Sequence, residues 1–163
     1  MANWNQNNDL IHGDDLLLYL VDSASVIAYA TSCSLQVDAE TIDTSSKFSC
    51  KWQSNMGGKA GYTISCDALY TKSEDGISFD DLLGLMVAGN QVEWYMGPEE
   101  PWTGSCETNP HTLDTSSAST YYNGKAVVTS CSLEAGNNSI ASCSITLTGA
   151  GEIERNGAPI VSQ

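Results

Sequence analysis

Residues 27–37 read IAYATSCSLQV, and apolar side chains alternate with polar ones along this stretch. The odd positions carry Ile27, Tyr29, Thr31, Cys33, Leu35 and Val37, and the even positions include Ser32, Ser34 and Gln36. A period of two residues is typical of a β-strand with one buried and one solvated face. The stretch therefore predicts a half-buried strand.

The same alternation recurs along the chain. It runs through residues 62–70, 127–133 and 141–147, and more briefly through 48–52; further strands are expected at 16–21 and 92–96. No rhythm of alternating strands and helices appears, so the strands should pair antiparallel. The predicted fold class is mainly β: two packed antiparallel sheets, as a β-sandwich or flattened barrel.

One short α-helix is expected to flank these sheets. Phe79, Leu82, Leu83 and Met86 have helical spacing. Ser78 stands at the N-cap position with Asp81 three residues later, and Gly89 follows the last apolar residue. These residue types are typical helix start and stop signals.

The 163 residues and an apolar fraction of 41% fit a single domain, 1–163, with its own core. Size scaling gives a folded accessible surface of roughly 7,800 Å². Two segments read as irregular: an inter-strand loop at about 53–60, rich in glycine, and a long loop at about 97–119 that contains three prolines. Long loops on a rigid scaffold often meet a partner or ligand.

Five of the six cysteines lie on the apolar parity of expected strands, where a reduced thiol acts as a small hydrophobe. Core thiols are the favoured reading, with disulfides or a metal site as the alternative, since no CxxC spacing occurs. Cys106, in a loop, stays undecided. The pentapeptide TSCSL occurs at 31–35 and at 129–133. This indicates either a duplicated strand pair, one per sheet, or a chance match.

The net charge of -14 argues against ordinary nucleic-acid binding and against a basic membrane-binding patch. The apolar run 16–21 is too short to span a bilayer, and the start of the chain lacks a signal-peptide pattern, so a soluble protein without a membrane partner is expected. With only His12 and His111 as imidazole bases and no intact catalytic, cofactor or metal motif, no catalytic, cofactor-binding or metal residues are predicted.

Three segments together carry a family resemblance. They read DLLLYLVDSASVIAYATSCSLQVDAETIDTSSK (15–47), GYTISCDALYT (61–71) and YYNGKAVVTSCSLEAGNNSIASCSITLTGAGEI (121–153). Their strand texture and order resemble the major tail tube protein of long-tailed bacteriophages, in the TP901-1 type family. The cysteine content and the 97–119 region depart from that pattern.

The resemblance implies a virion tail component, assembled in the host bacterial cytoplasm, whose hexameric rings stack into a hollow tube for DNA ejection. Its implied partners are further copies of itself and the tape-measure, tail terminator and baseplate proteins, with DNA passing through the lumen without specific binding. Residues 52–60 match in position the family's loop to the neighbouring ring, which implies contacts by Trp52, Asn55, Met56 and Lys59.

The acidic charge fits a duct that repels DNA phosphates within the Debye length of ~8 Å, although it equally serves to keep a monomer soluble. Two other functions stay open. One is a related ring or tube protein of a type VI secretion system or tailocin. The other is a carbohydrate-binding β-sandwich, for which the four tryptophans Trp4, Trp52, Trp94 and Trp102 are the motivation.

Overall fold

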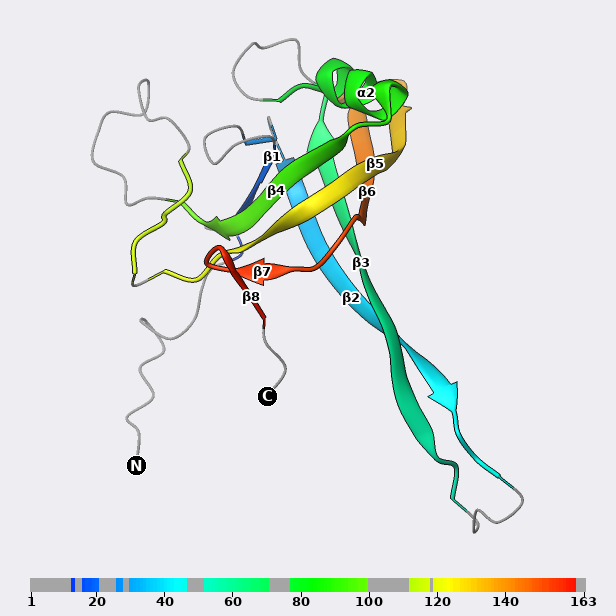
Figure 1. The fold of residues 1–163 in the computed structure, drawn as a ribbon. Coiled ribbons are helices and arrows are strands. Elements are labelled where there is room, and N and C mark those ends of the chain that lie inside the picture. Colours follow the sequence, from blue (N-terminus) through cyan, green and yellow to red (C-terminus); the bar gives the residue numbers. More distant parts are fainter. Residues whose placement is uncertain are drawn as a thin grey trace, which may run out of the picture.

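The computed structural model describes residues 13, 16–20, 26–27, 30–46, 52–70, 77–99, 112–117 and 119–160. Figure 1 shows the elements of these parts in their arrangement. They are β1 (Leu16–Leu20), β2 (Ala30–Asp43), β3 (Asn55–Leu69), α2 (Phe79–Ala88), β4 (Gln91–Pro98), β5 (Tyr122–Glu134), β6 (Ser142–Gly149), β7 (Glu154–Arg155) and β8 (Ala158–Pro159).

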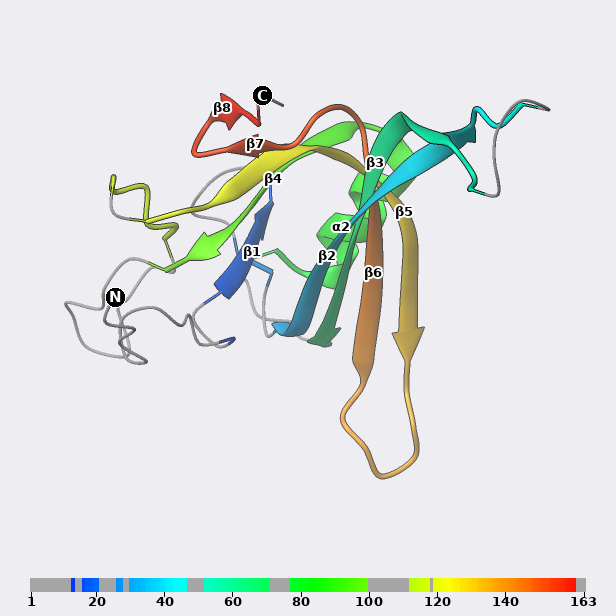
Figure 2. The same ribbon diagram turned by 90° about the horizontal axis from the view of Figure 1, so that it is seen from below.

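The described strands form one antiparallel sheet, with the order β1-β4-β5-β6-β3-β2 and the short β7 and β8 attached to β5. Figures 1 and 2 show that this sheet curls, so that β1 and β4 lie apart from the steep β2 and β3. The mainly β class with one short helix is confirmed, whereas the two separate packed sheets are not found in this part of the chain.

The continuity of the sheet depends on β5. Its first half pairs with β4 from Tyr122 to Val127, and it pairs with β6 from Ala126 to Glu134. A bulge between Val128 and Ser130 interrupts the register with β6, and bulges bend a strand and increase its twist. Alternating hydrophobicity predicts which face of a strand is buried. It does not show that a single strand, β5, pairs with β4 and with β6 and so joins the two halves of the sheet.

The core fills the concave side of the curl. Its largest fully buried side chain is Trp94 of β4, which packs against Tyr62 of β3 with ring centroids 5.5 Å apart and an interplanar angle of 57°. Other core residues are Leu18, Leu20, Ile64, Cys66, Leu82, Val128, Cys143, Ile145 and Leu147. The parity predicted for β3 and β6 therefore agrees with the observed core face. For β5 the prediction is wrong in the first half, where Ala126 and Val128 are buried in place of Val127, because the bulge after Val128 shifts the alternation by one residue.

Helix α2 begins and ends as its sequence predicts. The side chain of Ser78 accepts a hydrogen bond from the backbone N–H of Asp81, and the Asp81 carboxylate accepts from the Ser78 backbone N–H at 3.0 Å, which together form a capping box. Gly89 follows in the left-handed conformation and its N–H bonds to the Leu85 carbonyl. Leu82 is the buried residue by which the helix joins the core.

The prediction of an inter-strand loop at about 53–60 is wrong, because residues 55–60 belong to β3. Met56 and Gly57 pair with Ile42 and Thr41 of β2. A Cβ on Gly58 would lie 3.0 Å from the carbonyl oxygen of Glu40, at the bulge in β2. Gly58 therefore allows close approach of two backbones, where the sequence pattern indicated only flexibility.

Other strand boundaries also differ from those that the sequence predicts. The strand predicted at 27–37 begins at Ala30 and continues to Asp43, and Ile27 lies in a separate bridge to Ile77. Of the segment 48–52, only Trp52 is described, and it is not in a strand; of the loop at 97–119, Gly97 and Pro98 end β4. Residues 100–111 and 118, with Cys106, and residues 47–51, with Cys50, lie outside the described residues.

Candidate functional site

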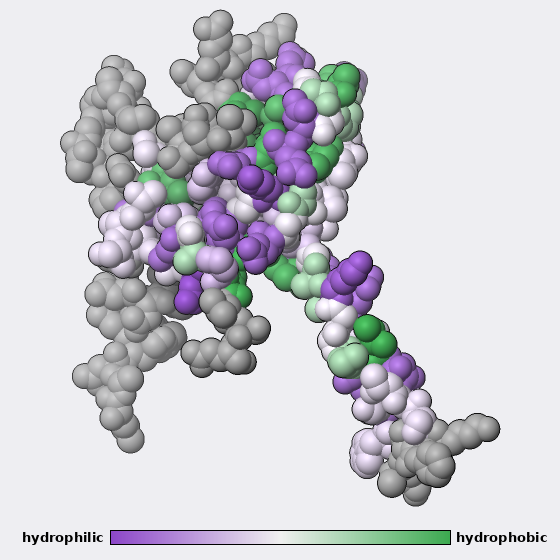
Figure 3. All heavy atoms as spheres, viewed as in Figure 1, coloured by the Kyte–Doolittle hydropathy of each residue, from purple (hydrophilic) through white to green (hydrophobic). Residues whose placement is uncertain are grey.

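The most unusual surface is a long two-stranded projection, here called the arm, formed by residues 36–46 and 52–61. Every residue of the arm is exposed. Figure 3 shows it leaving the body of the molecule with apolar and polar residues interspersed. The arm is therefore available to a partner.

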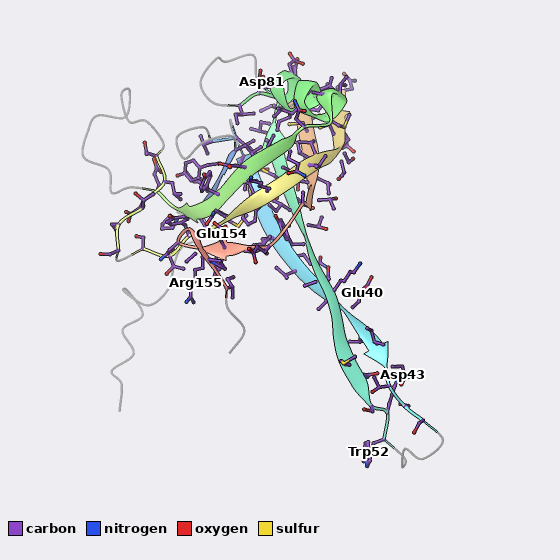
Figure 4. The ribbon with its side chains drawn as sticks, in the orientation of Figure 1. Glu40, Asp43, Trp52, Asp81, Glu154 and Arg155 are labelled. Carbon is purple, nitrogen blue, oxygen red and sulfur yellow. The ribbon has the colours of Figure 1, made fainter. Side chains whose placement is uncertain are left out.

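Large apolar side chains are exposed along the arm. Val37 is 56% exposed, Ile42 is 50% and Met56 is 57%, while Trp52 is 86% exposed. Ile42 and Met56 are direct cross-strand partners. Figure 4 places Trp52 at the far end, close to Asp43. A monomer gains nothing from apolar groups in these positions, so they indicate a contact surface.

Three of the four predicted contact residues come together in the distal half of the arm. Asn55 pairs with Asp43, Met56 is the next residue, and Trp52 precedes them at the tip. Lys59 lies apart from them, nearer the base of the arm, where it lines a groove. Their role in stacking is not tested by this arrangement and remains a prediction.

Hydrogen bonds hold the two strands of the arm together beyond their last pair. The Thr44 backbone N–H donates to the Ser54 carbonyl at 2.8 Å, and its hydroxyl donates to the Ser54 Oγ at 2.9 Å. The Asp43 carboxylate accepts from the Ser45 backbone N–H at 2.8 Å and from the Gln53 amide. The hydrogen bonds from Ser45 lower the pKa of Asp43, so its charge persists in mild acid.

An apolar groove of about 900 Å³ lies where the arm joins the body. Its apolar lining comes from four parts of the chain: Leu35, Val37, Tyr62, Tyr122, Ile153 and Ile160. Lys59 and Glu152 add charged groups to the lining. The sequence analysis missed this groove, because β2, β3, β5 and the segment around β7 and β8 come together only in the folded chain.

The face of β5, β6, β3 and β2 that points away from the core is rich in hydroxyl groups. It carries Ser130 and Ser132 of β5, Ser144, Thr146 and Thr148 of β6, Thr63, Ser65 and Asp67 of β3, and Ser32, Ser34 and Gln36 of β2. The Asp67 carboxylate accepts hydrogen bonds from Ser32 at 3.0 Å and from Ser144 at 2.6 Å, and so ties three strands together. This hydroxyl face is polar, and both Asp67 and Glu134, which the register places opposite Ser142 on the same face, are acids.

The outer border of β2 is open. Within the described residues β2 pairs with β3 alone, and its 14 residues contain no proline or lysine to block further pairing. On the other side of the hydroxyl face, residues 129–134 of β5 pair with β6 and with no second strand that the structure describes. Long open strand borders favour pairing with another chain.

Other candidate sites receive little support. Trp94 is fully buried and Trp52 lies alone on the arm, so these two do not form a sugar-binding platform; Trp4, Trp102, His12 and His111 lie outside the described residues. Among the described parts of the chain, no group of metal-ligating side chains is assembled. The same parts include no helix with the length and apolarity needed to cross a membrane.

No protein-family model and no curated protein sequence matches the chain. Solved structures do match. A chain of the virion of a native gene transfer agent particle has a TM-score of 0.66 at 20% identity, with 90% of this chain and 98% of that chain covered. A chain of the SPP1 tail tube has a TM-score of 0.65 at 12% identity, with 92% and 81% covered.

A third similar chain comes from the sheath-tube complex of an extracellular contractile injection system, with a TM-score of 0.57 at 16% identity and coverage of 90% and 91%. The fold of this chain is therefore the one found in the SPP1 tail tube and in the sheath-tube complex of a contractile injection system. The resemblance seen in the sequence is confirmed at the level of fold.

Proposed function

We propose that this chain is the structural subunit of a phage tail tube, in which hexameric rings stack into a hollow conduit for DNA ejection. The observation that carries the proposal is the pair of open strand borders on either side of the hydroxyl face, in a chain with the tail tube fold. A chain from a gene transfer agent tail solved with C6 symmetry has the same fold, with a TM-score of 0.64. A virion tail is the location that follows.

The ring forms by head-to-tail contact. The β2 border of one subunit pairs with residues 129–134 of β5 in the next, so that the strands β5, β6, β3 and β2 continue into a closed barrel. Such a contact joins two different surfaces, and it closes into a ring when the rotation per subunit divides a full turn. Closure covers these two open borders, which accounts for a long β2 without proline or lysine.

The hydroxyl face lines the lumen in this arrangement. Neutral hydroxyl groups offer DNA phosphates weak contacts that water replaces easily, and Asp67 adds one negative charge per subunit in the middle of the face. Basic side chains are what retains nucleic acid electrostatically, and none stands at the positions that define this face. DNA therefore passes without being held.

The arm provides the stacking contact between rings. Trp52, Asn55 and Met56 at its distal half reach the adjacent ring, and the apolar groove at the base of the arm is the surface that receives an arm from another copy. Lys59, at the groove, supplies a positive charge for the acidic residues of the incoming arm. Burial of apolar area on both sides drives the association.

Partners follow from the same role. The chain acts with copies of itself and with tape-measure, tail terminator and baseplate proteins, and catalysis has no part in it. Similar folds occur in a sheath/tube terminator of a contractile injection system and in a tube-terminating cap and a baseplate of an anti-feeding prophage. These likenesses keep a contractile-system or tailocin tube as the second candidate.

Electron microscopy of the concentrated protein tests the proposal. The expected result is rings or hollow tubes with six-fold symmetry in projection, in which one sheet continues across each subunit boundary. Protein that remains monomeric when mixed with its tail terminator and tape-measure partners contradicts it. A tape-measure gene beside the coding sequence, without a sheath gene, favours the long non-contractile tail over the second candidate.

A further inference from the structure

Two cysteines face each other across the β2 and β3 strands. Cys33 and Cys66 are direct cross-strand partners, and their Sγ atoms lie 2.8 Å apart. The bond of a disulfide is about 2.05 Å long, so the two sulfur atoms need to move by less than an ångström to bond. Cys66 is 1% exposed, while Cys33 is half-buried and lies on the strand at the open border. A small reagent therefore meets Cys33 first.

The second TSCSL segment provides an internal comparison. Cys131 occupies in β5 the place that Cys33 occupies in β2, and one cross-strand row contains Cys131, Ile145, Cys66 and Cys33. Cys131 faces Ile145, and Cys143 faces Leu133 on one side and Ala68 on the other. Of the four cysteines that the structure describes, only Cys33 and Cys66 face each other. The two hairpins also share one sheet, so the expectation of one per sheet is wrong.

We propose that Cys33 and Cys66 form a reversible disulfide when the folded subunit meets a low-molecular-weight disulfide. The Cys33 thiolate attacks one sulfur of the reagent RSSR, which gives a Cys33–SR mixed disulfide and releases RS⁻. Cys66 then loses its proton to solvent and attacks the Cys33 sulfur, which expels a second RS⁻ that takes up a proton. The two cysteines are oxidised by two electrons, and RSSR is reduced to two RSH.

The surroundings of the pair favour this order of attack. A hydrogen bond from Cys66 lowers the pKa of the Cys33 thiol, and the same hydrogen bond and burial raise that of Cys66. The thiolate is the attacking form in thiol–disulfide exchange, so the residue that solvent reaches is also the better nucleophile. The bulk of RSSR contacts only the half-buried sulfur, and the buried thiol completes the reaction from within the core.

The bond would join positions 33 residues apart and attach β2 to β3 within the body, three residues before β2 enters the arm. A cross-link of this span restricts the unfolded chain, and in the chain-entropy model the resulting stabilisation grows with the logarithm of the loop length. For a domain of this size, the thermal midpoint should rise by about 5–10 °C. The proposal concerns the single subunit and does not depend on tube formation.

Peptide mapping tests the site directly. The unassembled wild-type protein is incubated with oxidised glutathione at neutral pH, its remaining thiols are alkylated in denaturant, and it is digested with trypsin without reduction. Cleavage after Lys47, Lys59 and Lys72 separates Cys33, in peptide 1–47, from Cys66, in peptide 60–72. The expected product is a linked pair of these two peptides that a reductant splits.

Three variants complete the experiment. Cys33→Ser and Cys66→Ala should each lose the linked peptides and the rise in thermal midpoint, whereas Cys131→Ser, the matched change in the second TSCSL segment, should keep both. The proposal is overturned if Cys33 and Cys66 of the folded wild type are recovered in alkylated form, because they were then still free thiols after the incubation. It is also overturned if either is linked mainly to another cysteine. The wild-type map decides this even where a variant fails to fold.

Discussion

The indole N–H of Trp94 donates a hydrogen bond of 3.1 Å to the phenolic oxygen of Tyr62, inside the core. Tyr62 in turn donates to the backbone carbonyl of Lys125. Trp94 lies in β4 and Tyr62 in β3, and these strands are separated in the sheet by β5 and β6. The contact therefore spans the curl of the sheet and holds its two halves at a fixed distance.

Removal of the Tyr62 hydroxyl should destabilise the fold. Tyr62→Phe leaves the buried indole N–H of Trp94 without its acceptor, and an unpaired buried donor costs about 1–3 kcal/mol. Urea denaturation followed by circular dichroism measures the change. Tyr122→Phe, at a side chain that is 38% exposed, is the control and should change the unfolding free energy by less than about 0.5 kcal/mol.

Gly149 is required by the same cluster. A Cβ at this position would lie 2.5 Å from the ring of Tyr62, so Gly149→Ala should cost about 1–3 kcal/mol through displacement of that ring. Gly84 in α2 has open space around its Cα, and Gly84→Ala should stabilise the protein by about 0.5–1 kcal/mol. Thermal denaturation should show a lower midpoint for Gly149→Ala and a higher midpoint for Gly84→Ala than for the wild type. Midpoints that shift in the same direction would contradict the packing described for Gly149.

The helix cap should be sensitive to acid. Ser78→Ala removes the cap and should cost about 1 kcal/mol. Hydrogen bonds from Ser78 lower the pKa of Asp81 below its ordinary 3.8, so the ionised carboxylate stabilises the fold above that pH and the benefit is lost as pH falls through the lowered pKa. The difference between wild type and Asp81→Asn in unfolding free energy should therefore begin to shrink near the ordinary pKa of 3.8 and disappear only once the pH lies below the lowered pKa of the folded state. Asp80→Asn, a neighbouring exposed acid, is the control.

The arm should matter for assembly and not for stability. Met56→Asp introduces a charge at a side chain that is 57% exposed, so the thermal midpoint should stay within about 2 °C of wild type. Tubes should be lost or shortened in electron micrographs, because the apolar contact between rings is interrupted. Val87→Asp changes an equally apolar, 80% exposed residue of α2. If Val87→Asp abolishes tubes and Met56→Asp does not, the arm has a different role.

A positive charge on the hydroxyl face should make the tube retain DNA. Asp67→Lys changes the charge of a hexameric ring by about twelve units if each of six subunits contributes two, and lysines in the lumen attract phosphate. Assembled tubes of the variant should bind short fluorescent single-stranded DNA in a salt-dependent way, measured by anisotropy. Asp80→Lys, with the same change of charge on α2, should not bind DNA inside the tube; equal binding by both variants places Asp67 outside the lumen.

Local signals account for what the sequence predicts well. Ser78, Asp81 and Gly89 define α2 through contacts within four residues, and the parity of residues such as Ile64 and Ile145 follows from alternation along one strand. Pairing between distant segments is different. Residues 55–60 were predicted as a loop because their glycines suggest flexibility, while their strand depends on β2 lying alongside.

The candidate site divides in the same way. Trp52, Asn55 and Met56 are close in the chain and share the arm, so sequence position was enough to group them. The hydroxyl face depends on register, since Asp67 meets Ser32 and Ser144 from positions 35 and 77 residues away. The groove requires four separate parts of the chain to come together. Neither the hydroxyl face nor the groove can be recognised from the residues of a single strand.

The arm projects from one side of the body, as Figure 1 shows, and the groove at its base belongs to the same subunit. In the proposed stacking, the arm of one copy occupies the groove of another, and the added copy then offers an identical arm to the next. Growth of this kind has no internal stopping point, because every addition regenerates the surface that permitted it. The length of the polymer must then be specified by a different molecule that acts as a ruler.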